Sequence, residues 1–313
     1  MVNDLNIRTK VYIAIVVSML FWSFSFIWFK MANVFYKPIT IVFLRLVIAV
    51  TLLSLFLWLT GSLKRMRIKR EDRRYFLLLG FFEPFLYFLG ESFGLTYMSS
   101  TAGSVLIATI PVFAIIGAWL LFREKLSIKN YLGVALSFVG VIVFILNSDG
   151  SLSFNIKGVL LMLLAVMSAV GYNLTLRRLA GDYNPVFIVN IQNIIGLVLF
   201  LPLFLLLDLN DFLNTPHSAE AIAPVILLAV FASSGAFILF AWSVRHLGIA
   251  RSNVFSNCIP VFTAIFAFFL LGEQLTPRNI AGMTMVIAGL FLSQMNGRRK
   301  VKPEAEILTG KTA

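Results

Sequence analysis

The segment Ile110-Pro111-Val112-Phe113 recurs 149 residues later as Ile259-Pro260-Val261-Phe262. The match continues in one ungapped frame, in which 13 of the 36 positions from Val105 to Gly140 are identical to their counterparts. Shared hydrophobicity does not explain the matched polar and glycine positions, which are Glu124 with Glu273, Asn130 with Asn279, Gly133 with Gly282 and Gly140 with Gly289. The chain therefore contains an internal duplication.

The duplication extends toward the N-terminus at a shift of 147 residues, which places Lys30 on Arg177, Tyr36 on Tyr183, Pro38 on Pro185 and Arg45 on Gln192. We therefore expect one repeat over residues 1–147 and a second over residues 148–297. The remaining residues, 298–313, are rich in Lys, Pro, Glu and Gly and are predicted to form a disordered cytoplasmic tail.

The composition is that of a membrane protein, with 59% hydrophobic and 13% charged residues. Soluble domains carry about 25% charged residues. The apolar residues occur in runs long enough to cross a hydrocarbon core of ~30 Å as helices. The sequence predicts an all-α protein with ten transmembrane helices, at about 11–29, 39–60, 75–95, 98–122, 130–147, 155–176, 185–207, 221–244, 248–271 and 279–296.

The Lys and Arg residues predict the orientation. With the N-terminus inside, 21 of them fall in cytoplasmic segments and only 4 in outer loops, while Arg45 lies within a span. This asymmetry predicts a multi-pass plasma-membrane (bacterial inner-membrane) protein with both termini in the cytoplasm. Because each repeat holds five spans, the second must be inverted relative to the first, an arrangement typical of secondary transporters.

Several short segments occur in a distinctive order along the chain, among them 22–30 with Pro38, 44–46, 97–104 and 133–140, together with their second-half counterparts. In this order and spacing the chain resembles the EamA family of the drug/metabolite transporter superfamily. The resemblance implies a substrate pathway between the two repeats and movement of small metabolites, often export of amino acids or related compounds.

Ionisable side chains within spans are the first candidates for the substrate site, because a charge that faces lipid is costly. Glu83, Tyr87 and Glu91 are spaced to share one face of the third span. Arg45 is predicted at a depth similar to that of Glu91, so an ion pair between the two is possible, and Glu83 would then be free to bind a substrate amine or a proton. The alternative, in which Glu83 only bonds to a neighbouring helix backbone, stays open.

Further candidates for substrate binding or gating are an aromatic residue and buried amides, namely Trp22, Asn173, Asn190, Gln192, Asn193 and Asn257. Polar residues in membrane helices often bind neighbouring helices instead, so we expect about half of the polar candidates not to touch substrate. Pro111 and Pro260 lie mid-span and are candidate hinges, although packing kinks without mobility explain them equally well.

Other function classes fit less well. Gly310-Lys311-Thr312 resembles the end of a phosphate-binding loop, but Ala305 stands where that loop requires glycine. Metalloprotease and serine-hydrolase motifs are missing from the sequence, so we expect no catalytic residues, metal site, cofactor or nucleic-acid partner. A channel, a receptor or a lipid translocator on the same scaffold remains the alternative. The sequence thus predicts a proton-coupled or facilitative carrier that exports a small-molecule substrate across the lipid bilayer by alternating access, with its oligomeric state open.

Overall fold

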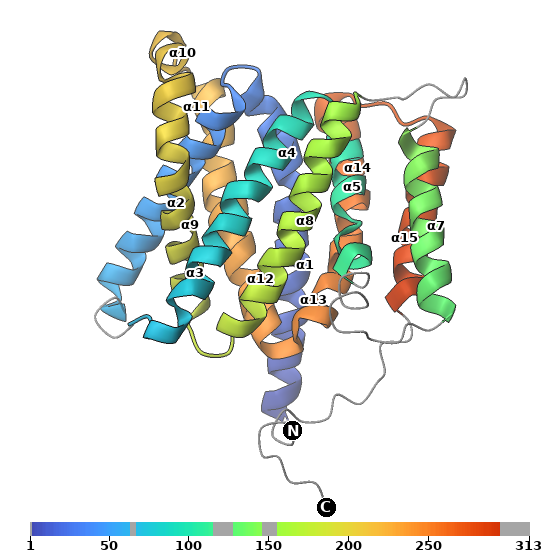
Figure 1. Cartoon of the computed structure of the whole chain (residues 1–313), viewed down its shortest axis with the longest axis horizontal. Helices are drawn as coiled ribbons and strands as arrows, with labels where there is room; N and C mark the ends of the chain where they lie inside the picture. Colours follow the sequence, from blue (N-terminus) through green and yellow to red (C-terminus); the bar gives the residue numbers. More distant parts are fainter. Residues whose placement is uncertain (1, 63–66, 115–127, 146–154, 295–313) are drawn as a thin grey trace, which may run out of the picture.

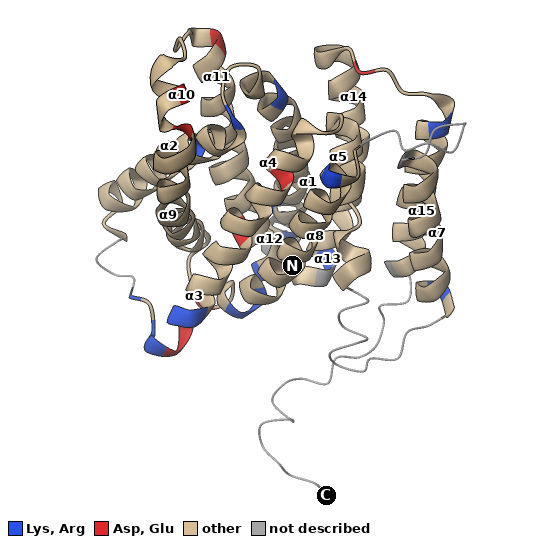
Figure 2. Cartoon of the chain, turned by 45° about the horizontal axis from the view of Figure 1, so that its top comes forward, with Lys and Arg blue, Asp and Glu red and all other residues tan. Residues whose placement is uncertain are grey.

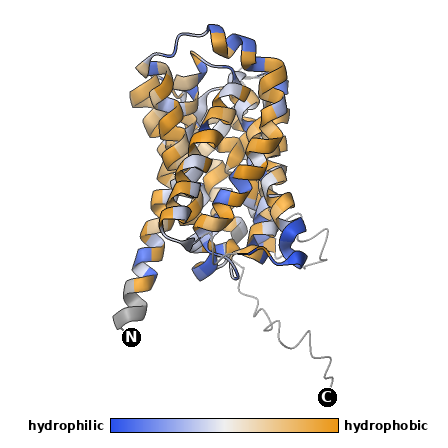
Figure 3. Ribbon diagram, turned by 90° about the vertical axis from the view of Figure 1, so that its left-hand side faces the viewer, coloured by the Kyte–Doolittle hydropathy of each residue, from blue (hydrophilic) through white to orange (hydrophobic). Residues whose placement is uncertain are grey.

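A computed structural model describes residues 2–62, 67–114, 128–145 and 155–294, and the regular structure within these ranges is entirely helical. The helices run side by side as a bundle (Figure 1). Apolar residues cover its length and hydrophilic ones gather at its two ends (Figure 3). Seven described helical segments are long and apolar enough to span a membrane, and two shorter apolar ones cover 100–114 and 128–144. The fold is therefore that of a multi-pass membrane protein.

Six α-helices of the first repeat are described, namely α1 (Val2–Asn33), α2 (Pro38–Leu59), α3 (Arg73–Gly80), α4 (Tyr87–Thr96), α5 (Ser100–Ile107) and α7 (Ile128–Ile145). Those described in the second repeat are α8 (Ile156–Leu179), α9 (Pro185–Leu203), α10 (Leu209–Asn214), α11 (Ala219–Leu227), α12 (Phe237–Leu247), α13 (Ile249–Val254), α14 (Ile259–Leu271) and α15 (Pro277–Gln294). The expected fourth span runs into residues 115–127, which lie outside the described part. The expected tail, residues 298–313, also lies outside it.

Local sequence explains where several helices begin. Pro38 and Pro185 occupy the first positions of α2 and α9, where a residue without an N–H costs no hydrogen bond. Asn155 and Asn184 cap α8 and α9, because each side chain accepts a hydrogen bond from a backbone N–H two residues later.

The packing of α7 against α15 shows that the two repeats are inverted (Figure 1). A Cβ atom added to Gly133 would overlap the backbone at Gly289, and one added to Gly140 would overlap the backbone at Gly282. The helices are therefore antiparallel and in close contact through small residues. Because Gly133 corresponds to Gly282 and Gly140 to Gly289, exchanging the repeats converts each contact into the other, as a two-fold axis across the helices requires.

Hydrogen bonds along the same pair of helices follow this symmetry. The Asn130 amide donates to the Ser293 carbonyl, and its counterpart Asn279 donates to the Phe144 carbonyl. Ser293 lies 149 residues after Phe144, so the two bonds are equivalent. The matched asparagines and glycines of the sequence repeat thus form one symmetric contact between the repeats.

Other helix pairs join the repeats in the same way. Helix α2 packs on its counterpart α9, and α5 packs on α14, which lie in the equivalent fourth and ninth expected spans. The carboxylate of Glu273 accepts bonds from the Ser100 N–H at 2.7 Å and the Thr101 N–H at 3.2 Å. The Glu273 carboxylate therefore caps the start of α5, where free N–H groups attract an anion.

Two spans are interrupted at equivalent places. A widened, π-type turn covers Phe81–Leu86 between α3 and α4, and another covers Leu228–Ala236 between α11 and α12. Glu83 has an extended backbone there (φ −145°, ψ 116°) and precedes Pro84. The expectation of one continuous helical face through Glu83, Tyr87 and Glu91 is therefore wrong, because the helix breaks at Glu83.

The end of the bundle at which α2 ends and α3 begins carries many Lys and Arg residues, and we call it the basic end (Figure 2). Buried Asp72 there accepts a hydrogen bond from the Tyr183 hydroxyl at 2.8 Å and lies 3.3 Å from Arg178. Lys69 donates to Asp182 at 3.0 Å, and this bond lowers the pKa of Asp182 below its usual range. The two repeats are therefore joined at the basic end.

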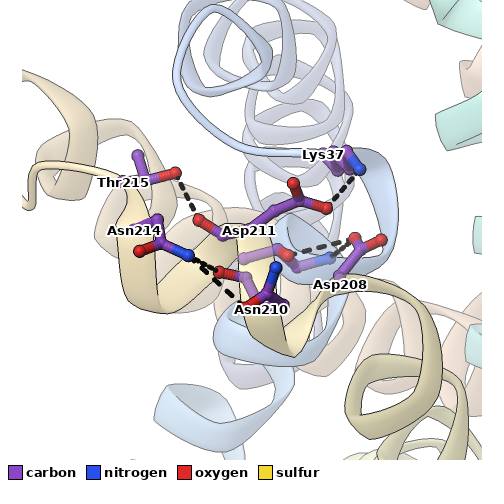
Figure 4. A network of polar contacts seen from close by, with 7 residues as sticks. Lys37, Asp208, Asn210, Asp211, Asn214 and Thr215 are labelled. Carbon is purple, nitrogen blue, oxygen red and sulfur yellow. Dashed lines mark hydrogen bonds and ion pairs between the residues drawn. The ribbon is translucent and has the colours of Figure 1, made fainter.

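The opposite end has its own contacts between repeats (Figure 4). Lys37 forms an ion pair with Asp211. Buried Asp208 accepts hydrogen bonds from the backbone N–H and the hydroxyl of Thr40, each at 3.0 Å. Part of the predicted outer loop before α11 is helical, as α10, and presents Asp211 to α2.

The glycine contact between α7 and α15 gives the first testable prediction. We expect Gly140→Ala to destabilise the fold by about 1–3 kcal/mol, because its Cβ would lie 2.6 Å from the Val286 backbone nitrogen. Thermal unfolding in detergent measures the effect. Gly181→Ala is the matched control, since nothing lies within 4 Å of its Cβ position. A Gly140→Ala protein as stable as the Gly181→Ala protein would contradict this packing.

Candidate functional site

A cavity lies between the repeats, bordered by α1, α2, α4, α5, α8, α12 and α13. The empty space between its lining atoms is about 660 Å³, a figure that includes open solvent at the mouth of the cavity. Its wall is largely aromatic and comes from both repeats, with Trp22, Phe26, Phe88, Tyr172, Phe237 and Phe240.

Three ionisable side chains share this cavity. Arg45 from α2 is 2% exposed, and Glu83 and Glu91 from the interrupted third span are each 6% exposed. Non-helical backbone at membrane depth is tolerated only where protein buries it or where it lines a cavity. The helix break at Glu83 meets this condition, since Glu83 is itself a lining residue.

Arg45 is held by the second repeat. Its Nε donates to the Ser233 hydroxyl at 2.7 Å, and its guanidinium carbon lies 4.1 Å from the centroid of the Phe88 ring. Ser233 lies in the widened turn before α12, and its carbonyl accepts a bond from the Asn193 amide at 3.1 Å. Among the described residues, Arg45 and Glu91 form no ion pair, so the pairing considered from the sequence is replaced by this contact.

The acids differ in their surroundings. Tyr87 donates to Glu91 at 3.0 Å, as expected for residues four apart on α4. Glu83 lines the cavity without a hydrogen bond to another described side chain or backbone group. Glu83 therefore has its acceptor oxygens available to a bound molecule.

The structure brings six of the predicted residues into the cavity wall, namely Trp22, Arg45, Glu83, Tyr87, Glu91 and Asn173. The other four are buried outside it. Asn190 bonds to Ser54, Asn193 bonds to the Ser233 carbonyl, and Gln192 and Asn257 have no hydrogen-bond partner among the described residues. Which of these residues touch substrate stays a prediction.

The two repeated prolines lie where helices restart. Pro260 is in the first turn of α14, after a 3₁₀ turn over Phe255–Cys258, and Pro111 follows the end of α5 at Ile107. A proline at these positions leaves few hydrogen bonds unmade. Ser256 in the 3₁₀ turn and Ile110 beside Pro111 line the cavity. A hinge role for both prolines stays a prediction.

Sequence reasoning missed Ser233 and Phe88 as partners of Arg45. Ser233 is a small residue in an apolar segment. At the shift of 149 residues it corresponds to Pro84 in the other repeat, so the duplication gave no signal for it. A search for small polar residues that could lie opposite Arg45 would have found it.

The family model of the EamA-like transporter family matches the chain twice, over residues 9–146 and 156–295. The chain belongs to the EamA-like transporter family. The two matches coincide with the two repeats of the structure.

Similar proteins cover nearly the whole chain. An uncharacterized transporter of Archaeoglobus fulgidus is 28% identical over 90% of this chain and 98% of its own length. The uncharacterized transporter YcxC of Bacillus subtilis is 25% identical over 94% of this chain and 96% of its own. A protein of Streptantibioticus cattleyicolor named as a probable terminal-alkyne amino-acid exporter is 25% identical over 67% of this chain and 69% of its own.

A solved crystal structure has a TM-score of 0.65 to this EamA-like protein, over 91% of this chain and 98% of that one. The two sequences are 13% identical, so this likeness shows the fold alone.

The contact between Arg45 and Ser233 gives the second prediction. We expect Ser233→Ala to cost about 1–3 kcal/mol of stability, because the buried Nε donor loses its acceptor. Ser243→Ala is the matched control, since that equally buried hydroxyl bonds only to Leu239 in its own helix. Thermal unfolding in detergent compares the two variants, and equal losses would show that Ser233 does not hold Arg45.

Proposed function

We propose that this EamA-like protein is a secondary transporter that exports a small amine-bearing metabolite, such as an amino acid or a related compound. Transport proceeds by alternating access between the two inverted repeats and is driven by exchange for protons. The observation that carries the proposal is the set of three buried ionisable side chains, Arg45, Glu83 and Glu91, in one cavity between the repeats.

The charge balance of the cavity favours a cationic group as ligand. Two carboxylates face one guanidinium, so the ionised set has a net charge of minus one. A buried charge without compensation is costly. A proton or a substrate ammonium at Glu83 neutralises the set equally well, and competition between the two at one carboxylate couples their movements in opposite directions.

The position of the cavity supports alternating access. It lies between the repeats, and the two-fold relation of the repeats allows the same contacts to be made toward either side of the membrane. The relative named as a probable terminal-alkyne amino-acid exporter supports an amino-acid-like substrate. The aromatic wall favours a substrate that carries an apolar group beside its amine.

The third prediction concerns Glu83. We expect Glu83→Gln to slow transport driven by a pH gradient by about tenfold or more, because an amide binds neither a proton nor an ammonium as the carboxylate does. The measurement is transport of a panel of amino acids by proteoliposomes, with and without a pH gradient.

Glu220→Gln serves as the control, because Glu220 is an exposed acid in the first turn of α11, away from the cavity. It should transport at the wild-type rate. Unchanged transport and unchanged dependence on the gradient in the Glu83→Gln protein would refute the role of Glu83. A wild-type protein that moves none of these compounds would refute the proposed substrate class.

A further inference from the structure

Two polar side chains next to Glu83 have no partner. The hydroxyl of Tyr172, on α8, and both amide atoms of Gln192, on α9, are fully buried and make no hydrogen bond within the described residues. The Tyr172 hydroxyl lies near the Gln192 amide and within electrostatic range of Glu83. Buried polar groups in proteins are nearly always satisfied, so a group left unpaired indicates a missing ligand or water.

The duplication explains why these groups are unpaired. Gln192 is the counterpart of Arg45, and the Arg45 guanidinium finds its acceptor in Ser233. The counterpart of Ser233 is Pro84, which offers no side-chain hydrogen-bonding group. A Cβ atom added to Gly196 would overlap the Pro84 ring, so Pro84 does occupy the matching place beside α9. Gln192 has therefore lost the partner that symmetry would provide.

We propose that Glu83 and Tyr172 form a binding site for a primary ammonium group, with Gln192 as the positioning residue for the Tyr172 hydroxyl. Glu83 and Tyr172 both line the cavity, whereas Gln192 lies behind the wall. With an ammonium bound, we expect the Gln192 amide oxygen to accept the Tyr172 O–H, which leaves the hydroxyl oxygen free to accept from the ammonium. This assignment rests on the proposed transport of amine-bearing metabolites and specifies how their amine is recognised.

The count of donors and acceptors sets the specificity. A primary ammonium has three N–H donors, and the site offers three acceptor oxygens, two from the Glu83 carboxylate and one from Tyr172. Each methyl group added to the nitrogen removes one donor and leaves one buried acceptor unpaired. The aromatic wall alone would act differently, because it attracts quaternary ammonium groups by cation–π interaction. Primary, methylated and quaternary amines therefore distinguish the two modes of recognition.

The fourth prediction tests this site in the full-length protein reconstituted in proteoliposomes. The amino acid that the wild type transports best is compared with its N-methyl, N,N-dimethyl and N,N,N-trimethyl derivatives and with the carboxylic acid that lacks the amine, each as a competitor. We expect apparent affinity to fall about tenfold with each N–H that is removed. Equal competition by the primary and the trimethyl compounds would overturn the site, while the proposed transport of amino acids would stand.

Variants test the assigned residues. Tyr172→Phe should reduce the preference for the primary over the N-methyl compound by about tenfold, and Gln192→Leu should reduce it in the same direction by less. Neither should change competition by the carboxylic acid that lacks the amine. Tyr97→Phe, at a tyrosine that is 42% exposed, is the control and should behave as the wild type.

Uniform weakening of every competitor in the Tyr172→Phe protein would indicate a structural role and overturn the assignment. The methylation series on the wild type decides the question even if a variant fails to fold. If the wild type carries no amino acid or related amine at all, the ammonium site and the proposed function both fall.

Discussion

The free-energy cost of burying a charged side chain in an apolar environment determines how the centre of this structure is arranged. Arg45 is buried within a span, so its guanidinium must have a partner inside the protein. The partner is Ser233, in the opposite repeat, and the ring of Phe88 covers the guanidinium. The Arg45 guanidinium, the most costly group of the first repeat to bury, thus has its hydrogen-bond partner only when the second repeat is packed against it. This requirement fixes the cavity between the repeats.

The sequence predicted the scaffold because the duplicated residues are the contact residues. The matched glycines and asparagines form the crossing of α7 and α15, and matched Glu273 caps α5 across the repeat boundary. The glycine and asparagine contacts each have an equivalent under the two-fold relation, which explains why these residues recur in both copies. The number of ten spans stays a prediction, because part of the expected fourth span lies outside the described residues. Hydropathy also does not register interruptions such as the extended backbone at Glu83.

The ionisable residues of the cavity were the most evident from the sequence, which also named Trp22, Tyr87 and Asn173 of the same wall. Arg45, Glu83 and Glu91 were evident from the sequence because ionisable residues within apolar runs have few alternatives to a cavity. Ser233 gave no such signal, and its role depends on the widened turn that brings it to Arg45. The assumption of a continuous helix also concealed that Glu83 lies at a helix break, apart from Tyr87 and Glu91 on α4. The adjacent Pro84 was a sign of this break.

The contacts at the two ends of the bundle differ in strength from those at its centre. The ion pairs of Lys37 with Asp211 and of Lys69 with Asp182 join side chains that are 40–57% exposed, and such pairs contribute about 0–1 kcal/mol. Breaking them costs little. The bonds of buried Asp72 and Asp208 are harder to break, because each would leave a carboxylate unpaired inside the protein. Both of these buried acids bind segments next to α2 and α9, the pair of counterparts that also carries Arg45 and Gln192. These buried contacts, together with the close crossing of α7 and α15, therefore hold the repeats together more firmly than the exposed ion pairs do.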